Sequence, residues 1–367
     1  MKIKVDQNKL RKALGVVSRV AAGSKTTLPI LNNVLIKSEK NKVTFTTTNL
    51  DMAVVYYLAT TESEDGVITV PARLLADFVS NLPKGQVEID SKDTKVTVSL
   101  GKYKSIFNGV LADDFPELPE IDEKKATVFK IKVEDFKTYI NEVMVASSND
   151  LTRPALTGVY FNVFEKNLYV TATDGYRLVA RKMIEGVKSE ISTIVPSASL
   201  SEVLRSLDDE VEEIEILFDD SQVKFRLGEI EITSKIIEGS FPDYRQLIPK
   251  DTEIKIDLEK SELTRVVKLA ALFAKEVGGS IVCEAKEDEE LFTVAAVANE
   301  FGENTSEIKT KLVGNGKITL NSRYVLDALN TIEKDEIEFG FSGKLSPVVI
   351  KNKKSDNYVH IIMPLKS

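Results

Sequence analysis

Adjacent carboxylates are the first residues of this chain whose type could support catalysis. They occur as three pairs: Asp113/Asp114, Asp208/Asp209 and Asp219/Asp220. Paired carboxylates can act as general acid and base, or can hold a catalytic metal ion. Each pair lies in a predicted turn or loop, however, where solvated acidic residues are the common case. We therefore expect no catalytic residue at these positions.

The other residues capable of chemistry are few. Asp174 is followed by glycine after a predicted strand, and an Asp-Gly pair at that place is first of all typical of a turn. The only cysteine, Cys283, excludes an internal disulfide, and with the only histidine, His360, it leaves no donor set for zinc. His360 lies in the last predicted strand without an obvious partner. Because the chain also lacks phosphate-binding and dinucleotide-binding glycine motifs, we expect no metal and no cofactor.

Composition indicates a soluble globular protein. The chain has 367 residues, 43% of them hydrophobic, which is enough for two to four domains. No apolar run reaches the ~20 residues of a membrane helix, and the first residues do not resemble a signal peptide, so we expect a cytoplasmic protein. The net charge is −8, from 49 basic and 57 acidic residues. This balance argues against a uniformly basic surface that grips nucleic acid tightly.

The sequence repeats itself at about one third of its length. A strand end that runs into a short amphipathic helix recurs at Val70-Pro71-Ala72, Val195-Pro196-Ser197 and Leu320-Asn321-Ser322, with the same spacing both times. Another predicted helix begins each third of the chain, near residues 5, 133 and 258, and precedes the short helix along the sequence. Alternating β-branched strands lie between and after the helices. Each unit therefore reads helix, strands, helix, strands, and we predict three α+β domains over residues 1–121, 128–248 and 252–367.

Basic residues recur on the helices of these units. Lys9, Lys12 and Arg19 lie within about 80° of one another around their helix, opposite its apolar face. The six predicted helices together carry slightly more basic than acidic residues. The excess of acidic residues therefore lies in the rest of the chain. We expect a mildly positive surface for loose, sequence-independent phosphate contact. The residues assigned to it are Lys9, Lys12, Arg19, Lys25, Arg73, Lys137, Arg205, Arg265, Lys268, Lys275 and Arg323.

The repeat and five short motifs resemble the bacterial sliding clamp, the beta subunit of the replicative DNA polymerase, over the whole chain. The motifs are KTTLPILNNVLI (25–36), LTGVYF (156–161), ATDGYRL (172–178), GSFPDYRQLIP (239–249) and VHIIMPLKS (359–367). The resemblance implies three similar domains per protomer and two protomers that close head to tail into a ring, with helices inside and sheets outside. It also implies duplex DNA inside the ring.

The resemblance further implies partners and their sites. The expected partners are a second copy of the chain, the alpha subunit of the replicative polymerase, the clamp loader, and other polymerases and repair proteins that carry short apolar motifs. For the contact between protomers it implies Ile106 and Phe107 on one side, with Leu272 and Phe273 on the other. The family's basic residues near the middle domain are replaced here by Ser197 and Gln246, which leaves individual DNA contacts of that domain open.

The partner peptides are expected in a pocket between the second and third domains. Carried over by resemblance, its wall is Leu156, Thr173, Gly175, Tyr176, Arg177, Leu178, Pro242, Leu247, Ser346, Ile361, Ile362, Met363, Pro364 and Leu365. A plainer interpretation is that 361–365 only complete the last strand and that Leu156 and Leu178 belong to the core. Met363 is flexible enough to accept different partners, and Arg177 could fix the polar end of a peptide.

Two functions are consistent with these sequence features. The first is a sliding clamp, a binding protein without catalysis that acts by encircling DNA. The alternative is a carboxylate-dependent nuclease built on the same repeat. Magnesium-dependent DNA cleavage by the pure protein would favour the nuclease.

Overall fold

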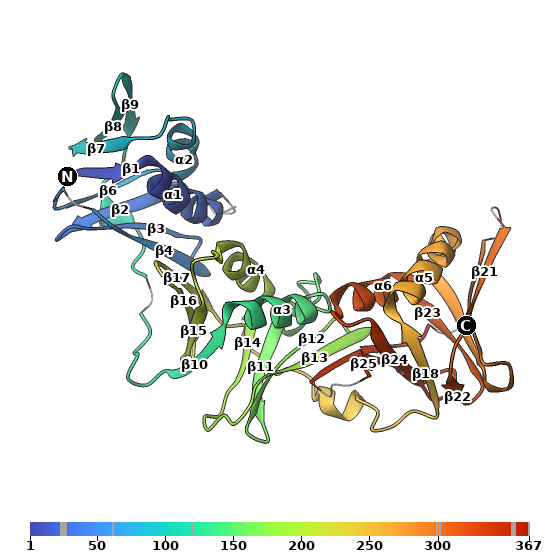
Figure 1. Ribbon diagram of the computed structural model, residues 1–367. Coiled ribbons are helices and arrows are strands. Elements are labelled where there is room, and N and C mark those ends of the chain that lie inside the picture. Colours follow the sequence, from blue (N-terminus) through green and yellow to red (C-terminus); the bar gives the residue numbers. More distant parts are fainter. Residues whose placement is uncertain are drawn as a thin grey trace. The chain divides into compact units, whose positions relative to one another are not determined.

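The structure is a computed structural model that describes residues 1–22, 28–60, 62–118, 120–298, 300, 302–353 and 357–365. The chain packs into two compact units (Figure 1). The first comprises residues 1–133 and 198–236, and the second comprises residues 134–197 and 237–367. The middle third of the sequence thus contributes to both units.

All six predicted helices are confirmed. Among the described residues, the α-helices are α1 (Gln7–Ala22), α2 (Ala72–Ser80), α3 (Val133–Met144), α4 (Ser197–Ser206), α5 (Lys260–Ala274) and α6 (Ser322–Thr331). Short 3-10 turns are η1 (Pro29–Asn32), η2 (Ala112–Asp114), η3 (Pro154–Leu156), η4 (Tyr244–Leu247), η5 (Lys275–Val277) and η6 (Glu287–Glu289). The apolar stripe of α1 at Leu10, Leu14 and Val17 is fully buried, as the helical spacing indicates. No helix in the described ranges is long and apolar enough to cross a membrane.

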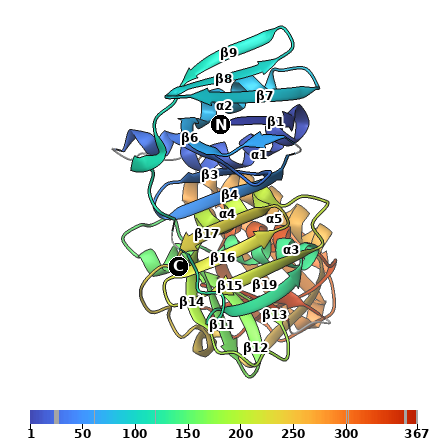
Figure 2. The same ribbon diagram turned by 90° about the vertical axis from the view of Figure 1, so that its left-hand side faces the viewer.

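The first unit contains two antiparallel sheets. The smaller has the order β5 (Ser63–Glu64), β1 (Lys2–Asp6), β7 (Gln86–Lys92), β8 (Lys95–Leu100), β9 (Tyr103–Asn108). The larger has the order β10 (Thr127–Lys132), β15 (Glu213–Phe218), β16 (Gln222–Leu227), β17 (Ile230–Lys235), β4 (Met52–Ala59), β3 (Lys42–Thr48), β2 (Asn33–Glu39), β6 (Gly66–Pro71). Strands from the first and middle thirds meet where β17 pairs with β4 (Figure 2).

The second unit repeats this arrangement. Its larger sheet has the order β14 (Ser192–Pro196), β11 (Gly158–Phe164), β12 (Asn167–Thr173), β13 (Arg177–Ile184), β26 (Tyr358–Ile362), β25 (Val348–Asn352), β24 (Glu336–Phe341), β18 (Ile254–Glu259), β22 (Leu312–Val313). Its smaller sheet has the order β21 (Gly302–Lys309), β20 (Leu291–Ala298), β19 (Ser280–Lys286), β23 (Gly316–Asn321). Here the middle and last thirds meet where β13 pairs with β26.

These two junctions follow one rule. In each third, the third strand after the first helix is β4, β13 or β21. Three more strands follow the second helix, and the last of them is β9, β17 or β26. The junctions pair β4 with β17 and β13 with β26, both antiparallel. The two strands left over, β9 and β21, lie at sheet edges.

Candidate partner and DNA surfaces

The junction between β13 and β26 brings together two segments of the predicted pocket. Leu178 pairs with Ile361 and Arg177 with Ile362. The chain then continues the contact beyond the strand, because the amide of Met363 donates to the carbonyl oxygen of Tyr176 at 2.8 Å. The tight turn between β12 and β13 therefore lies directly beside the C-terminal segment. This proximity could not be calculated from sequence spacing, since the two segments are nearly 190 residues apart.

The turn before β13 is held by its own side chains. The Asp174 carboxylate accepts hydrogen bonds from the amides of Tyr176 at 2.9 Å and Arg177 at 3.0 Å. The Thr173 hydroxyl donates to the Arg177 carbonyl oxygen at 2.6 Å, and it accepts from the amide of Gly175 at 3.1 Å. Gly175 has φ +91°, a conformation that other residues rarely adopt. Asp174 thus has the turn role that its Asp-Gly sequence indicates.

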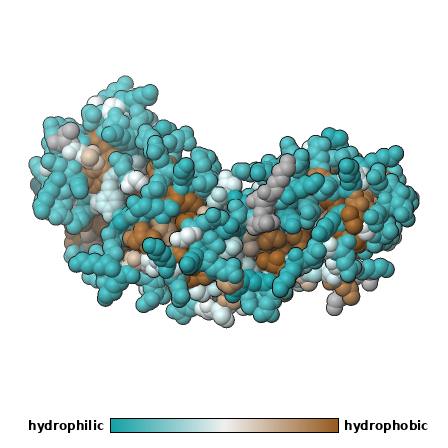
Figure 3. All heavy atoms as spheres, turned by 60° about the horizontal axis from the view of Figure 1, so that its bottom comes forward, coloured by the Kyte–Doolittle hydropathy of each residue, from teal (hydrophilic) through white to brown (hydrophobic). Residues whose placement is uncertain are grey.

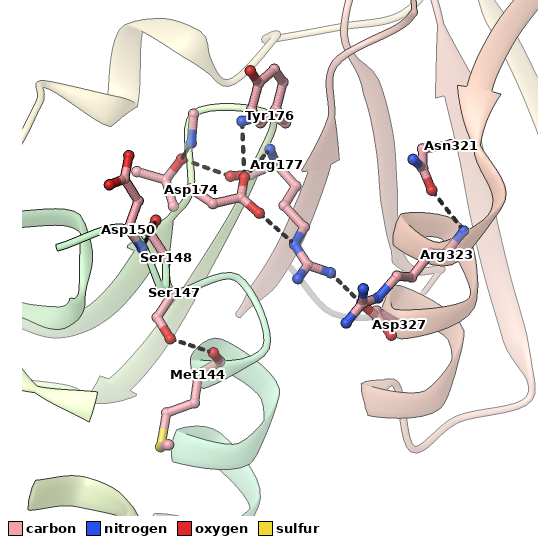
Figure 4. A network of polar contacts seen from close by, with 12 residues as sticks. Met144, Ser147, Ser148, Asp150, Asp174, Tyr176, Arg177, Asn321, Arg323 and Asp327 are labelled. Carbon is pink, nitrogen blue, oxygen red and sulfur yellow. Dashed lines mark hydrogen bonds and ion pairs between the residues drawn. The ribbon is translucent and has the colours of Figure 1, made fainter. Parts of the chain in front are cut away.

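Arg177 is bound inside the protein on two sides (Figure 4). Its guanidinium donates to Asp174 at 3.0 Å and to Asp327 of α6 at 2.5 Å, and it lies 4.6 Å from the ring centre of Tyr324. Only 8% of the residue is exposed. Two carboxylates therefore hold the guanidinium, and the residue positions the turn against α6. Its contact with the polar end of a peptide stays a prediction.

The predicted pocket residues divide into a buried floor and an exposed rim. Leu178 and Ile361 pack with Tyr244 in one hydrophobic cluster, and Leu156 is also buried. The rim residues are exposed, with exposed fractions of 59% for Tyr176, 51% for Leu247 and 38% for Met363. Large apolar side chains at a protein surface mark a binding region when they adjoin a continuous apolar floor. Ile361 belongs to this buried cluster, and its place in the pocket wall stays a prediction.

Ile362 lies differently from the neighbouring residues of the predicted wall. Ile362 is fully buried, and as the neighbour of Ile361 on a strand it points to the opposite face of the sheet. Ile361 and Ile362 therefore lie on opposite faces of the sheet, and the place of Ile362 in the pocket wall stays a prediction. Pro364 and Leu365 follow the strand, and the amide of Leu365 donates to the Thr319 carbonyl oxygen at 2.9 Å.

The remaining wall residues come from three loops. Leu156 ends η3, Pro242 and Leu247 lie on the exposed segment around η4, and Ser346 precedes β25. A side chain that sequence reasoning missed joins them. Arg153 places a guanidinium nitrogen 3.3 Å from the position that a Cβ on Gly175 would occupy. Its only sequence signal was its place just before the LTGVYF motif.

The basic residues assigned to the DNA surface lie on helices or at their ends, except Lys25, which lies outside the described residues. Most of them are exposed, namely Lys9, Lys12, Arg73, Lys137, Arg205, Arg265, Lys268, Lys275 and Arg323. Two are engaged by carboxylates within the first unit. Lys12 forms an ion pair with Asp208, and Arg19 bonds to the buried Glu202 at 2.5 Å. These pairs reduce the charge available to phosphate, which fits weak DNA binding.

We expect charge reversal of the exposed cations to weaken direct DNA binding. The double variant Lys9→Glu/Arg265→Glu should bind duplex DNA more weakly at low salt, and the log–log salt slope should fall by roughly one for each phosphate that the variant no longer neutralises. Fluorescence anisotropy across a salt series measures both. The matched control is Lys130→Glu on strand β10, which should leave the slope unchanged. Equal slopes for all three proteins would remove these helices from the DNA surface.

The residues assigned to the protomer contact differ in exposure. Ile106 on β9 is 63% exposed and Leu272 on α5 is 61% exposed, so both are available to a partner. Phe107 is 5% exposed and packs edge to face on Phe78, with ring centres 5.6 Å apart. Phe273 is half-buried. Figure 3 shows apolar patches on a mostly hydrophilic face of the molecule.

Two of the candidate acidic residues have structural roles. Asp208 is paired with Lys12, and Asp219 caps a turn by accepting from the amides of Ser221 and Gln222. In the described part of the chain, no three of His, Cys, Asp and Glu form a group that could hold a metal ion. His360 has a partner after all, because its Nδ1 lies 3.1 Å from the Tyr358 hydroxyl. Complete burial lowers the pKa of His360 to about 3, so its ring is neutral.

Comparison with known proteins agrees with this geometry. Family models of the DNA polymerase III beta subunit match this chain in three places. The N-terminal domain matches residues 1–119, the central domain residues 130–243 and the C-terminal domain residues 245–366. The beta sliding clamp of Staphylococcus epidermidis is 31% identical over 359 residues, which cover 95% of this chain and 94% of the relative.

Solved structures are similar over the same length. The DNA polymerase sliding clamp from Bacillus subtilis has a TM-score of 0.94 and 28% identity, covering 100% of this chain and 99% of its own. A sliding clamp from Pseudomonas aeruginosa bound to griselimycin has a TM-score of 0.93 and 26% identity, covering 100% of both chains. These comparisons give no support to the nuclease alternative. With all three domain models matched in order, the chain belongs to the DNA polymerase III beta subunits, the beta sliding clamps.

Proposed function

We propose that two copies of this non-catalytic clamp close head to tail into a ring around duplex DNA in the cytoplasm, and that the ring tethers the replicative polymerase. The observation that carries the proposal is the rule of the two junctions. Within one chain, a strand of the set β4, β13 and β21 pairs twice with a strand of the set β9, β17 and β26. The strands left at edges, β21 and β9, are one member of each set. A third junction of this kind between two chains would satisfy both edges, and repetition in the second chain would close a ring.

The charges of the two edges support this pairing. Strand β9 carries Lys104 and follows Lys102, whereas β21 carries Glu303 and Glu307. Opposite charges on paired strands stabilise a junction and oppose the pairing of two like edges. Ile106 on β9 would add an apolar contact, and Leu272 on α5 lies on the helix that packs against β21.

Inside the ring, the helices would offer phosphate contacts without reading bases. In this proposal the three clamp domains are residues 1–121, 128–248 and 252–367. The partner pocket beside Leu178 and Met363 would receive short apolar motifs from the polymerase alpha subunit, the clamp loader, and other polymerases and repair proteins. Because a Pseudomonas relative binds griselimycin, we propose that the compound competes with these motifs for the same pocket.

The ring requires a dimer. We expect light scattering at micromolar concentration to give twice the chain mass of 40.7 kDa. The double variant Ile106→Glu/Leu272→Glu should give the monomer mass, because it places charge in an apolar contact. Leu151→Glu is the control, since Leu151 is 82% exposed on a loop and belongs to neither edge strand. A wild-type monomer at every concentration would exclude the ring.

A further inference from the structure

A groove with a volume of about 380 Å³ lies on the second unit, next to the pocket. Its floor includes Ala180 of β13 and Val359 of β26, and its sides include Phe164, Arg245 and Lys351. None of these five residues belongs to the partner pocket. The groove therefore needs an account of its own.

The groove and the pocket share one sheet surface. Residues two apart on a strand point to the same face, so Ala180 lies beside Leu178, and Val359 lies beside Ile361. The strand register pairs Leu178 with Ile361 and Ala180 with Val359. Ala180 also belongs to the hydrophobic cluster of Leu178 and Ile361, against which Val359 packs. The groove thus continues the pocket floor by one step of two residues, about 7 Å along the strands.

The sides of the groove show which chemistry it would accept. Phe164 is 39% exposed, and the Arg245 guanidinium lies 4.4 Å from the centre of its ring. Ala180 gives the floor a small side chain, so a large apolar group has room above it. Lys351 lies at the other side, and its Nζ is 3.2 Å from a carboxylate oxygen of Glu338. Arg245 likewise has a nearby carboxylate, Asp243 at 3.3 Å. With both cations balanced, the groove selects an apolar side chain rather than an acidic one.

We propose that a partner peptide whose apolar motif occupies the pocket continues along the same face and places an aromatic residue in this groove. The inference rests on the pocket assigned under the proposed function. At ~3.3 Å per extended residue, the aromatic residue lies about two to four positions beyond the motif. Ring stacking on Phe164 and burial over Ala180 and Val359 would provide the added affinity.

The test uses the full-length protein and labelled peptides. Peptides tiled along the polymerase alpha subunit are screened by fluorescence anisotropy, and the shortest one that binds serves as the core peptide. Extended versions carry tryptophan at the second, third or fourth added position at either end, and each has a twin with serine at that position. We expect one tryptophan version to bind about tenfold more tightly than its serine twin.

Variants then assign that gain to the groove. Phe164→Ala and, separately, Arg245→Ala should remove most of the tenfold gain and leave the affinity of the core peptide unchanged. Val313→Ala is the control, since Val313 is 57% exposed on β22 at the far edge of the same sheet. If every tryptophan version binds like its serine twin, or if the gain survives in both groove variants, the inference is wrong while the pocket stands. If no peptide of any length binds, the pocket itself is wrong.

Discussion

Linearising a circular DNA molecule should release this protein at a salt concentration that it withstands on the closed circle. The chain has a net charge of −8, and Lys12 and Arg19 on α1 are already paired with carboxylates. Few phosphates are therefore neutralised, and a bound state that depended on them alone would be lost as salt rises. A closed ring on a closed circle does not depend on these contacts, because it cannot leave without opening.

The experiment compares a nicked circular plasmid before and after it is cut once. Labelled protein is loaded with the clamp loader on a nicked circle, separated from free protein by gel filtration in moderate salt, and then treated with a nuclease that cuts once. We expect the label to stay with the nicked circle and to move to the free fraction after cutting. A circle that lacks the cutting site controls for the nuclease itself. Equal retention on circular and linear DNA would mean that direct affinity, and not encirclement, holds the protein.

Deletion of residues 363–367 should abolish binding of polymerase peptides and leave the dimer intact. Strand β26 ends at Ile362, so the deletion keeps the junction with β13 and removes only the segment that follows it. That segment includes Met363, whose side chain is at the pocket rim, and Leu365. Loss of a central anchor typically costs ~2 kcal/mol or more of binding free energy, which corresponds to about thirtyfold in Kd.

Isothermal titration with the core polymerase peptide measures this loss, and light scattering checks the dimer. Met363→Ala should show a smaller loss in the same direction, whereas Val313→Ala, an exposed residue on β22, should bind normally. Griselimycin should compete with the peptide on the wild-type protein. A folded, dimeric deletion variant that binds the peptide with wild-type affinity would place the partner site elsewhere.

The sequence by itself determined the local structure and its repetition. The spacing of Leu10, Leu14 and Val17 was enough to predict a helix with one buried face, because helical periodicity is a property of neighbouring residues. The same holds for the turn at Asp174, whose side chain bonds to amides two and three residues ahead. The three-fold repeat and the family motifs were likewise visible in the sequence, and so was the family.

Contacts between distant segments were decided only by the tertiary structure. The pairing of β13 with β26 brings Tyr176 to Met363, and no local pattern encodes that register. The partners of Arg177 follow from the same junction, because Asp327 becomes its neighbour only when α6 packs beside the turn. Lys12 is exposed on α1, as the helical spacing indicates, yet its pairing with Asp208 joins residues almost 200 positions apart. Sequence periodicity fixes which face a residue lies on, whereas its partner across that face depends on how the strands and helices pack.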